Sequence, residues 1–186
     1  MLRKKWSNGS ARGKLLSTLA LVLLFALAPQ AAHATPPEAL HLELELVFPL
    51  GNFTGTGSWQ SSGLLQASGS AIQSEQLAGY DESGWFVRNV HSTATLCDGA
   101  IGDCAGVEDT ITIRSHITDL DFIPFGPASG DGRWVITDAT GVYAGLHGNG
   151  TAHFSSSFHF YCPDLLVAGP CLTETLTFEG QGHFEP

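Results

Sequence analysis

The sequence predicts an all-β protein built as a single domain and stapled by disulfides, on three observations. Apolar and polar residues alternate along several segments, which is the pattern of strands with one buried and one solvent-facing side. Gly, Asp, Ser and Pro separate these segments at the short spacing typical of a β-barrel or a β-sandwich. No segment after residue 34 has the periodicity of an amphipathic helix.

The first 34 residues have the features of a secretory signal peptide. Basic residues precede an apolar run of 13 residues, Leu15–Leu27, and small residues at Ala32 and Ala34 suit a cleavage site. A membrane anchor is the alternative, but this run is shorter than the roughly 20 residues that span a bilayer. We therefore expect cleavage after Ala34. The remaining residues 35–186 would form one barrel domain, secreted to the extracellular space or the periplasm and free of the membrane.

The expected mature chain is strongly acidic. Five of the eight basic residues lie before residue 35 and no acidic residue does, so Arg88, Arg114 and Arg133 face 18 acidic residues, a formal net charge of −15. Nucleic acids and anionic membranes bind through basic residues, so neither is expected as a partner. The mature chain contains no lysine, which excludes Schiff-base catalysis by a lysine.

Four cysteines in an exported chain predict two disulfides. Three pairings are open, and we favour Cys97–Cys104 with Cys162–Cys171 because each pair brackets a loop-like segment. A structural zinc site is the alternative, but the spacing within each pair is longer than zinc motifs use. His153 and His159 share a strand face but would lie about 20 Å apart, too far to share an ion. We expect no metal and no cofactor.

The first half of the expected domain contains four or five strands. Ala39–Phe48, "ALHLELELVF", places four leucines on one face and charged residues on the other. Gly57–Leu77 is rich in Ser and Gly and indicates two short strands around a turn. Gly84–Leu96 and Glu108–Phe122 are longer strands rich in β-branched and aromatic residues.

The second half begins with an expected surface loop, Pro124–Gly132. Strands follow at "GRWVIT", "VYAGLHG", "GTAHFSSSFHFY" and "TETLTFEGQGHF", which makes eight or nine strands in all. We expect Asp138–Gly141 to form a turn and His147–Gly150, "HGNG", a tight hairpin corner. A phosphate-binding glycine loop would need a helix after it, whereas the next segment alternates like a strand.

The segment Gly132–Phe154, "GRWVITDATGVYAGLHGNGTAHF", resembles a motif of the allene oxide cyclase and dirigent-like barrels. In that family a strand ending in W-x-I leads to a turn, a T-G-x-Y-A-G-L segment and a G-x-G-T hairpin. Gly55–Glu75 is similar to the early part of bacterial secreted members. The resemblance implies a single antiparallel eight-stranded barrel, calycin-like, with an apolar interior and often assembled as a homo-oligomer. No catalytic residue of the family can be aligned here, so none is assigned.

Five residues are candidates for binding a ligand. Neither face of the Arg88 strand is cleanly polar, so Arg88, Asn89 or His91 points into the barrel, where a polar group needs a partner or a ligand. Large aromatic residues line pockets, but they also fill cores and plug barrel ends. The candidates are Arg88, His91, Trp85, Trp134 and Tyr143.

The sequence is compatible with three functions. The first is a secreted barrel that binds a small apolar ligand in its cavity. The second is a non-catalytic extracellular module, structural or self-assembling, whose barrel is filled by its own side chains. The third is a cyclase or isomerase that acts by orienting an apolar substrate. We favour a binding or filled barrel over an enzyme.

Overall fold

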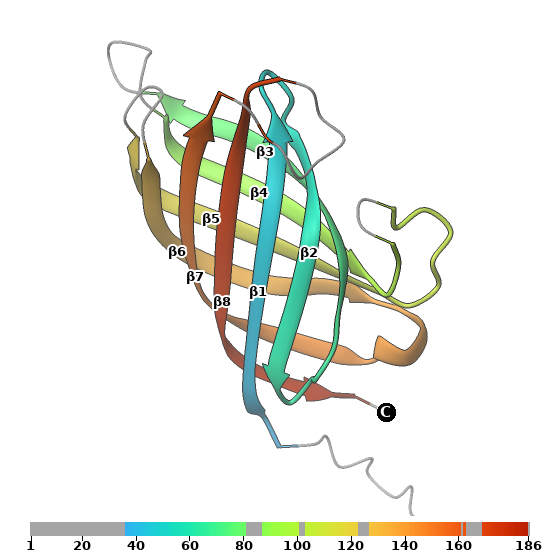
Figure 1. Ribbon diagram of the computed structural model, residues 1–186. Coiled ribbons are helices and arrows are strands. Elements are labelled where there is room, and N and C mark those ends of the chain that lie inside the picture. The colour runs from blue at the N-terminus through green and yellow to red at the C-terminus, as the bar shows by residue number, and fades with distance from the viewer. Residues whose placement is uncertain are drawn as a thin grey trace, which may run out of the picture. The chain divides into compact units, whose positions relative to one another are not determined.

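The computed structural model describes residues 36–80, 87–100, 103–122, 127–160, 162 and 169–185 of the chain. Eight strands pair in sequence order, each antiparallel to the next, and the last strand pairs with the first to close a barrel (Figure 1). This confirms the predicted all-β, antiparallel, eight-stranded barrel. The strands are β1 (Glu38–Pro49), β2 (Thr54–Gly63), β3 (Ser68–Tyr80), β4 (Val87–Cys97), β5 (Thr110–Phe122), β6 (Ala128–Ala139), β7 (Leu146–His159) and β8 (Cys171–Phe184).

Strand β1 shows how alternation becomes a barrel wall. Its four leucines and Phe48 are buried inside, and the residues between them lie on the outer face. The register places Leu44 opposite Trp59 of β2 and Leu176 of β8, so three strands contribute to one layer of the core. Burying each such side chain contributes about 1.5–3 kcal/mol relative to leaving it exposed.

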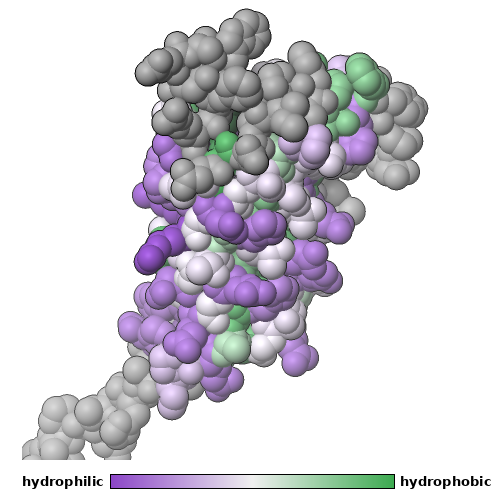
Figure 2. Space-filling view, turned by 90° about the vertical axis from the view of Figure 1, so that its left-hand side faces the viewer, coloured by the Kyte–Doolittle hydropathy of each residue, from purple (hydrophilic) through white to green (hydrophobic). Residues whose placement is uncertain are grey.

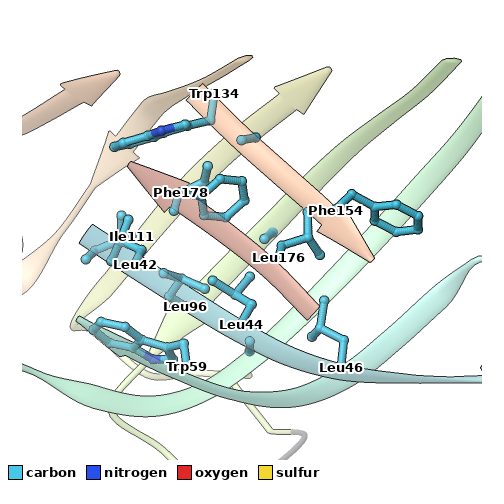
Figure 3. Packing of buried hydrophobic residues seen from close by; sticks show 14 of the residues in the cluster. Leu42, Leu44, Leu46, Trp59, Leu96, Ile111, Trp134, Phe154, Leu176 and Phe178 are labelled. Carbon is cyan, nitrogen blue, oxygen red and sulfur yellow. The ribbon is translucent and has the colours of Figure 1, made fainter. Parts of the chain in front are cut away.

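The core lies inside the barrel and includes buried side chains from all eight strands. Buried side chains from opposite walls converge there, with Trp59 and Trp134 on opposite sides of the cluster (Figure 3). The indole N–H of Trp59 donates to the carbonyl oxygen of Cys97 at 3.1 Å, and that of Trp134 donates to the carbonyl oxygen of Glu179 at 3.2 Å. Both buried indoles are therefore satisfied by backbone groups.

The predicted hairpin corner at His147–Gly150 is wrong, and the strand predicted at "VYAGLHG" is wrong in its first part, because β7 begins only at Leu146. A 3₁₀ turn, η1 (Gly141–Tyr143), follows β6, and β7 runs without interruption from Leu146 through the "HGNG" residues. The chain reverses instead at Gly141 and Gly145, where φ is 59° and 80°. Gly148 and Gly150 serve packing, because a Cβ on Gly150 would lie 1.9 Å from the carbonyl oxygen of Glu179.

The loop predicted at Pro124–Gly132 is also wrong in part, because β6 begins at Ala128. Gly130 and Gly132 lie in this strand on the inward face. A Cβ on Gly132 would lie 2.0 Å from the carbonyl oxygen of His116 on β5. Small residues are needed where two backbones approach closely, and the same small residues imitate a loop in the sequence.

The two disulfides join Cys97 to Cys104 and Cys162 to Cys171, which confirms the favoured pairing. Their Cα–Cα distances are 5.6 and 6.3 Å, within the usual range for a disulfide. Cys97 is the last residue of β4 and Cys171 is the first of β8, so each bridge ties a connecting segment to the end of a strand.

The outer wall of the barrel is largely hydrophilic on the face seen in Figure 2. This is the expected counterpart of an apolar interior, since alternate residues of each strand point outward. Within the described residues, no helix is long and apolar enough to cross a membrane.

Candidate functional site

A cavity of about 160 Å³ opens at the end of the barrel that carries the β1–β2 turn. This turn contributes Gly51, Asn52 and Phe53, and the strands contribute an apolar wall interrupted by a few polar groups. The apolar wall residues are Phe48, Leu77, Val90, Leu120, Ala128, Phe154 and Leu172. Within the described residues, this end of the barrel therefore holds a cavity lined by both apolar and polar groups.

Two glutamates, Glu75 of β3 and Glu174 of β8, line this cavity. Both side chains point into the barrel. In the register, Glu75 lies opposite Ser92, and Glu174 lies opposite Leu46 and Ser156. Glu174 is only 4% exposed. A buried carboxyl group is costly unless it is neutral or hydrogen-bonded, so this pair marks the site.

The two carboxyl groups hydrogen-bond to each other, and each changes the titration of the other. Burial raises the pKa of Glu174 well above its usual range, and the negative charge of Glu75 raises it further. Burial also raises the pKa of Glu75, against the lowering effect of hydrogen bonds with Glu174 and Gln73. Glu174 therefore holds the proton and donates it towards Glu75.

Gln73 extends the polar cluster one layer further into the barrel. It is fully buried, and its side-chain amide donates to Oε1 of Glu75 at 2.9 Å. Two buried oxygens have no hydrogen-bond partner among the described residues, Oε1 of Gln73 and Oε2 of Glu174. Unsatisfied buried acceptors are rare in folded proteins, and a ligand with a hydroxyl group would supply the missing donor.

A second pair of polar side chains faces the interior beside Glu75. The hydroxyl groups of Ser92 and Ser115, opposite each other on β4 and β5, hydrogen-bond to each other. Their hydrogen bonding is therefore satisfied internally. The acceptors without a hydrogen-bond partner are in the cluster of Gln73, Glu75 and Glu174.

The cavity end also has an apolar rim. Leu50 and Phe53 of the β1–β2 turn are 52% and 57% exposed, and Phe160, directly after β7, is 85% exposed. The ring of Phe160 packs edge-on against Phe158. Exposed large apolar side chains beside a cavity mouth are typical of a surface that contacts an apolar ligand.

Two of the five predicted ligand-binding residues, Trp134 and Tyr143, are buried away from the cavity. Trp134 packs against Phe178 in the core, and Tyr143 of η1 packs edge-on against Trp59. Burial raises the pKa of Tyr143, and the negative charges of Asp98 and Asp109 raise it further, so its phenol stays neutral. Trp134 is therefore a core residue, and Tyr143 closes one end of the barrel.

Of the other three predicted residues, the structure describes the side chain of His91 only. His91 lies on the outer face of β4, exposed and stacked on His116 of β5 with 4.2 Å between ring centroids. It therefore does not point into the barrel. The side chain of Arg88 and the whole of Trp85 lie outside the described residues.

The alternation of apolar and polar residues along β8 could have identified Glu174 as an inward-facing residue. Glu174 is in phase with Leu172, Leu176 and Phe178, so it falls on the apolar face of its strand. A carboxyl group at such a position is either buried or a break in the pattern. Glu75 gives no such signal, because its face contains Gln73 and the opposite face contains Ser and Gln.

No cluster of three or more potential metal-binding side chains occurs in the part of the chain that the structure describes. Comparison of the chain with protein-family models, with curated proteins and with solved structures finds no match.

Proposed function

We propose that this barrel binds the apolar end of a small molecule in the cavity and hydrogen-bonds its polar group to the Glu75–Glu174 pair. The observation that carries the proposal is a buried carboxyl group in a largely apolar cavity, with a pKa raised well above its usual range and one oxygen that has no hydrogen-bond partner among the described residues. Binding pockets commonly combine such an apolar wall with a few polar groups that fix the ligand's orientation.

The volume limits the part of the ligand that is enclosed. A cavity of about 160 Å³ is close to the roughly 150 Å³ that holds a benzene molecule in an engineered protein core. It is smaller than the roughly 300–1,000 Å³ of sites that enclose a whole drug-sized ligand. One ring or a short branched chain fits inside, and the rest of a larger ligand would lie against Leu50, Phe53 and Phe160 at the mouth.

The alternative functions relate to the same geometry. A barrel filled by its own side chains describes the core around Trp59 and Trp134 but not the cavity end. A cyclase or isomerase would use Glu174 as a proton donor and Glu75 as an acceptor, which requires a ligand bound in the cavity first. The binding experiment therefore comes before any test of catalysis.

The test uses phenol and toluene, which have equal numbers of non-hydrogen atoms but differ in one hydroxyl group. Binding is measured by NMR titration of the purified protein. We expect both probes to bind, and phenol to bind about fivefold more tightly, because one hydrogen bond to a neutral group is worth about 1 kcal/mol.

Two variants distinguish the cavity from unspecific binding. Ala128→Leu places a larger side chain in the cavity wall and should abolish binding of both probes. Ala144→Leu makes the same substitution at an exposed position at the other end of the barrel and should leave binding unchanged. The proposal is wrong if neither probe binds the wild type, or if Ala128→Leu binds both as well as Ala144→Leu does.

A further inference from the structure

The outer face of strands β3 to β6 is hollowed into a groove of about 790 Å³, here named the basic groove. It lies on the opposite side of the wall from the core, so it is separate from the cavity between the glutamates. Its outward-facing side chains include two arginines and two histidines but no carboxylate. The charged or titratable members are Arg114, Arg133, His91 and His116.

The strand register brings these four side chains together. His91 of β4, His116 of β5 and Arg133 of β6 are consecutive partners across the sheet, and Arg114 lies in the next row, opposite Val135. Arg114 and Arg133 are therefore diagonal neighbours on adjacent strands, and the backbone positions from which their side chains start are about 7–8 Å apart. Long side chains at this spacing can reach one ligand together.

Neither arginine is engaged within the described residues. The ion pairs there all use histidines, namely His147, His153 and His183. Asp131, two positions before Arg133 on the same face, lies 2.8 Å from His153 instead. Arg114 and Arg133 are exposed and make no ion pair or hydrogen bond in this part of the chain.

This arrangement is unusual for so acidic a chain. The formal net charge of the full sequence is −10, and Arg114 and Arg133 are two of the three arginines after residue 34. Both lie on one hollowed surface beside hydroxyl and amide groups of Ser74, Thr93 and Gln76. Guanidinium groups bind sulfate, phosphate and carboxylate through paired N–H donors, and neighbouring hydroxyl groups add further hydrogen bonds.

We propose that the basic groove binds a small polyanion, a molecule that carries two or more sulfate, phosphate or carboxylate groups. The two guanidinium groups would each hold one anionic group, and the stacked His91–His116 pair would supply further N–H donors. A groove of about 790 Å³ is larger than a single inorganic anion needs, which favours an extended ligand.

A second copy of this chain is the competing occupant, because β1 and β2 carry an acidic surface on the far side of the barrel. That surface, which includes Glu43 and Glu45, is itself hollowed, with a volume of about 500 Å³. Two concave surfaces cannot pack closely against each other. Shape therefore favours a separate ligand over the acidic face of a second copy.

The experiment measures binding of three probes by isothermal titration calorimetry at low salt: tripolyphosphate, citrate and sucrose octasulfate. They carry phosphate, carboxylate and sulfate groups respectively, so the tightest probe identifies the preferred anion. We expect at least one to bind, and Arg114→Gln and Arg133→Gln each to weaken that binding by about tenfold, the effect of losing a hydrogen bond between charged groups. Both positions are exposed, so both variants should fold.

A matched set of variants separates the groove from the overall charge. Glu45→Gln combined with Arg114→Gln restores the wild-type net charge but still lacks the groove arginine, so it should bind as weakly as Arg114→Gln alone. Glu45→Gln by itself should not weaken binding. The groove proposal is overturned if no probe binds, or if the Arg114→Gln/Arg133→Gln variant binds as tightly as the wild type. It is also overturned if that variant converts an oligomer to a monomer in light scattering, because the groove would then hold a second copy.

Discussion

At the scale of single residues, the protein is defined by one buried acid. Glu174 lies inside an apolar barrel with a second carboxyl group as its neighbour, and burial together with that neighbour raises its pKa well above the usual range. Such a group stays neutral at pH values where an exposed glutamate is ionised. Glu174 donates its proton to Glu75, so its second oxygen can accept a hydrogen bond from a ligand while the group stays uncharged.

The raised pKa predicts how stability depends on pH. In the unfolded chain Glu174 ionises near its usual pKa, and in the folded protein it ionises only at higher pH. Its contribution to stability is thus complete below about pH 4.3 and is lost as the pH rises through the folded-state pKa. The other polar groups that line the cavity with Glu174 are Asn52, Glu75 and Ser156, and Gln73 hydrogen-bonds to Glu75.

Glu174→Gln isolates this effect, because glutamine has the shape of the neutral acid and does not titrate. We expect the variant and the wild type to have similar free energies of unfolding at pH 4. Towards pH 8 the variant should become the more stable, by about 1.4 kcal/mol for each pH unit over which only the unfolded wild type is ionised. Urea unfolding at several pH values measures both curves. Parallel curves would mean that Glu174 ionises normally in the folded protein.

At the scale of elements, glycines let β7 and β8 approach each other closely beside Trp134. Trp134 pairs with Gly150, which pairs in turn with Gly180, and the indole N–H reaches across to the carbonyl oxygen of Glu179. Neither glycine has a positive φ, so their role is close approach and not backbone conformation.

Gly150→Ala should therefore destabilise the barrel. The added Cβ would lie 1.9 Å from the carbonyl oxygen of Glu179, so the strands must shift apart. Overpacking of this kind costs about 1–3 kcal/mol, which urea unfolding measures. Ser157→Ala, at an exposed position of the same strand, should change the free energy of unfolding by no more than about 0.5 kcal/mol. Equal effects of the two substitutions would refute this role for Gly150.

These glycines also show where sequence reasoning fails at this scale. The segment "HGNG" has the composition of a hairpin turn, and the prediction of a corner there follows from that composition. The actual turn uses Gly141 and Gly145, which have positive φ. Composition does not distinguish a glycine that turns the chain from one that lets two strands approach, because the partner strand decides which is needed.

At the scale of the whole molecule, alternation predicted the strands, whereas closure depends on distant pairing. β1 and β8 are joined along twelve residue pairs, from Glu38–Gly182 to Pro49–Cys171. Nothing local to either strand specifies this partner. The family resemblance implied a closed barrel, and the residues alone left a barrel and a sandwich open.

The candidate site was harder to predict than the fold for the same reason. Glu75 and Glu174 are about a hundred residues apart in the sequence, and they meet only because β3 and β8 face each other across the interior. Trp134 and Tyr143 were predicted to bind a ligand because they are large aromatic residues, but both pack in the core. The alternation of buried and outward-facing residues along β8 predicts the site better, because it places Glu174 among apolar residues.

The measurement that tests the central claim most directly is a carbon-13 NMR titration of the glutamate side-chain carboxyl groups. Glu174→Gln and Glu75→Gln assign the two signals. If the pair shares one proton in an apolar cavity, the Glu174 signal keeps the chemical shift of a protonated acid at neutral pH, and Glu75→Gln lowers its pKa by removing the neighbouring charge. A Glu174 signal that titrates near pH 4.3, like an exposed glutamate, would contradict the account.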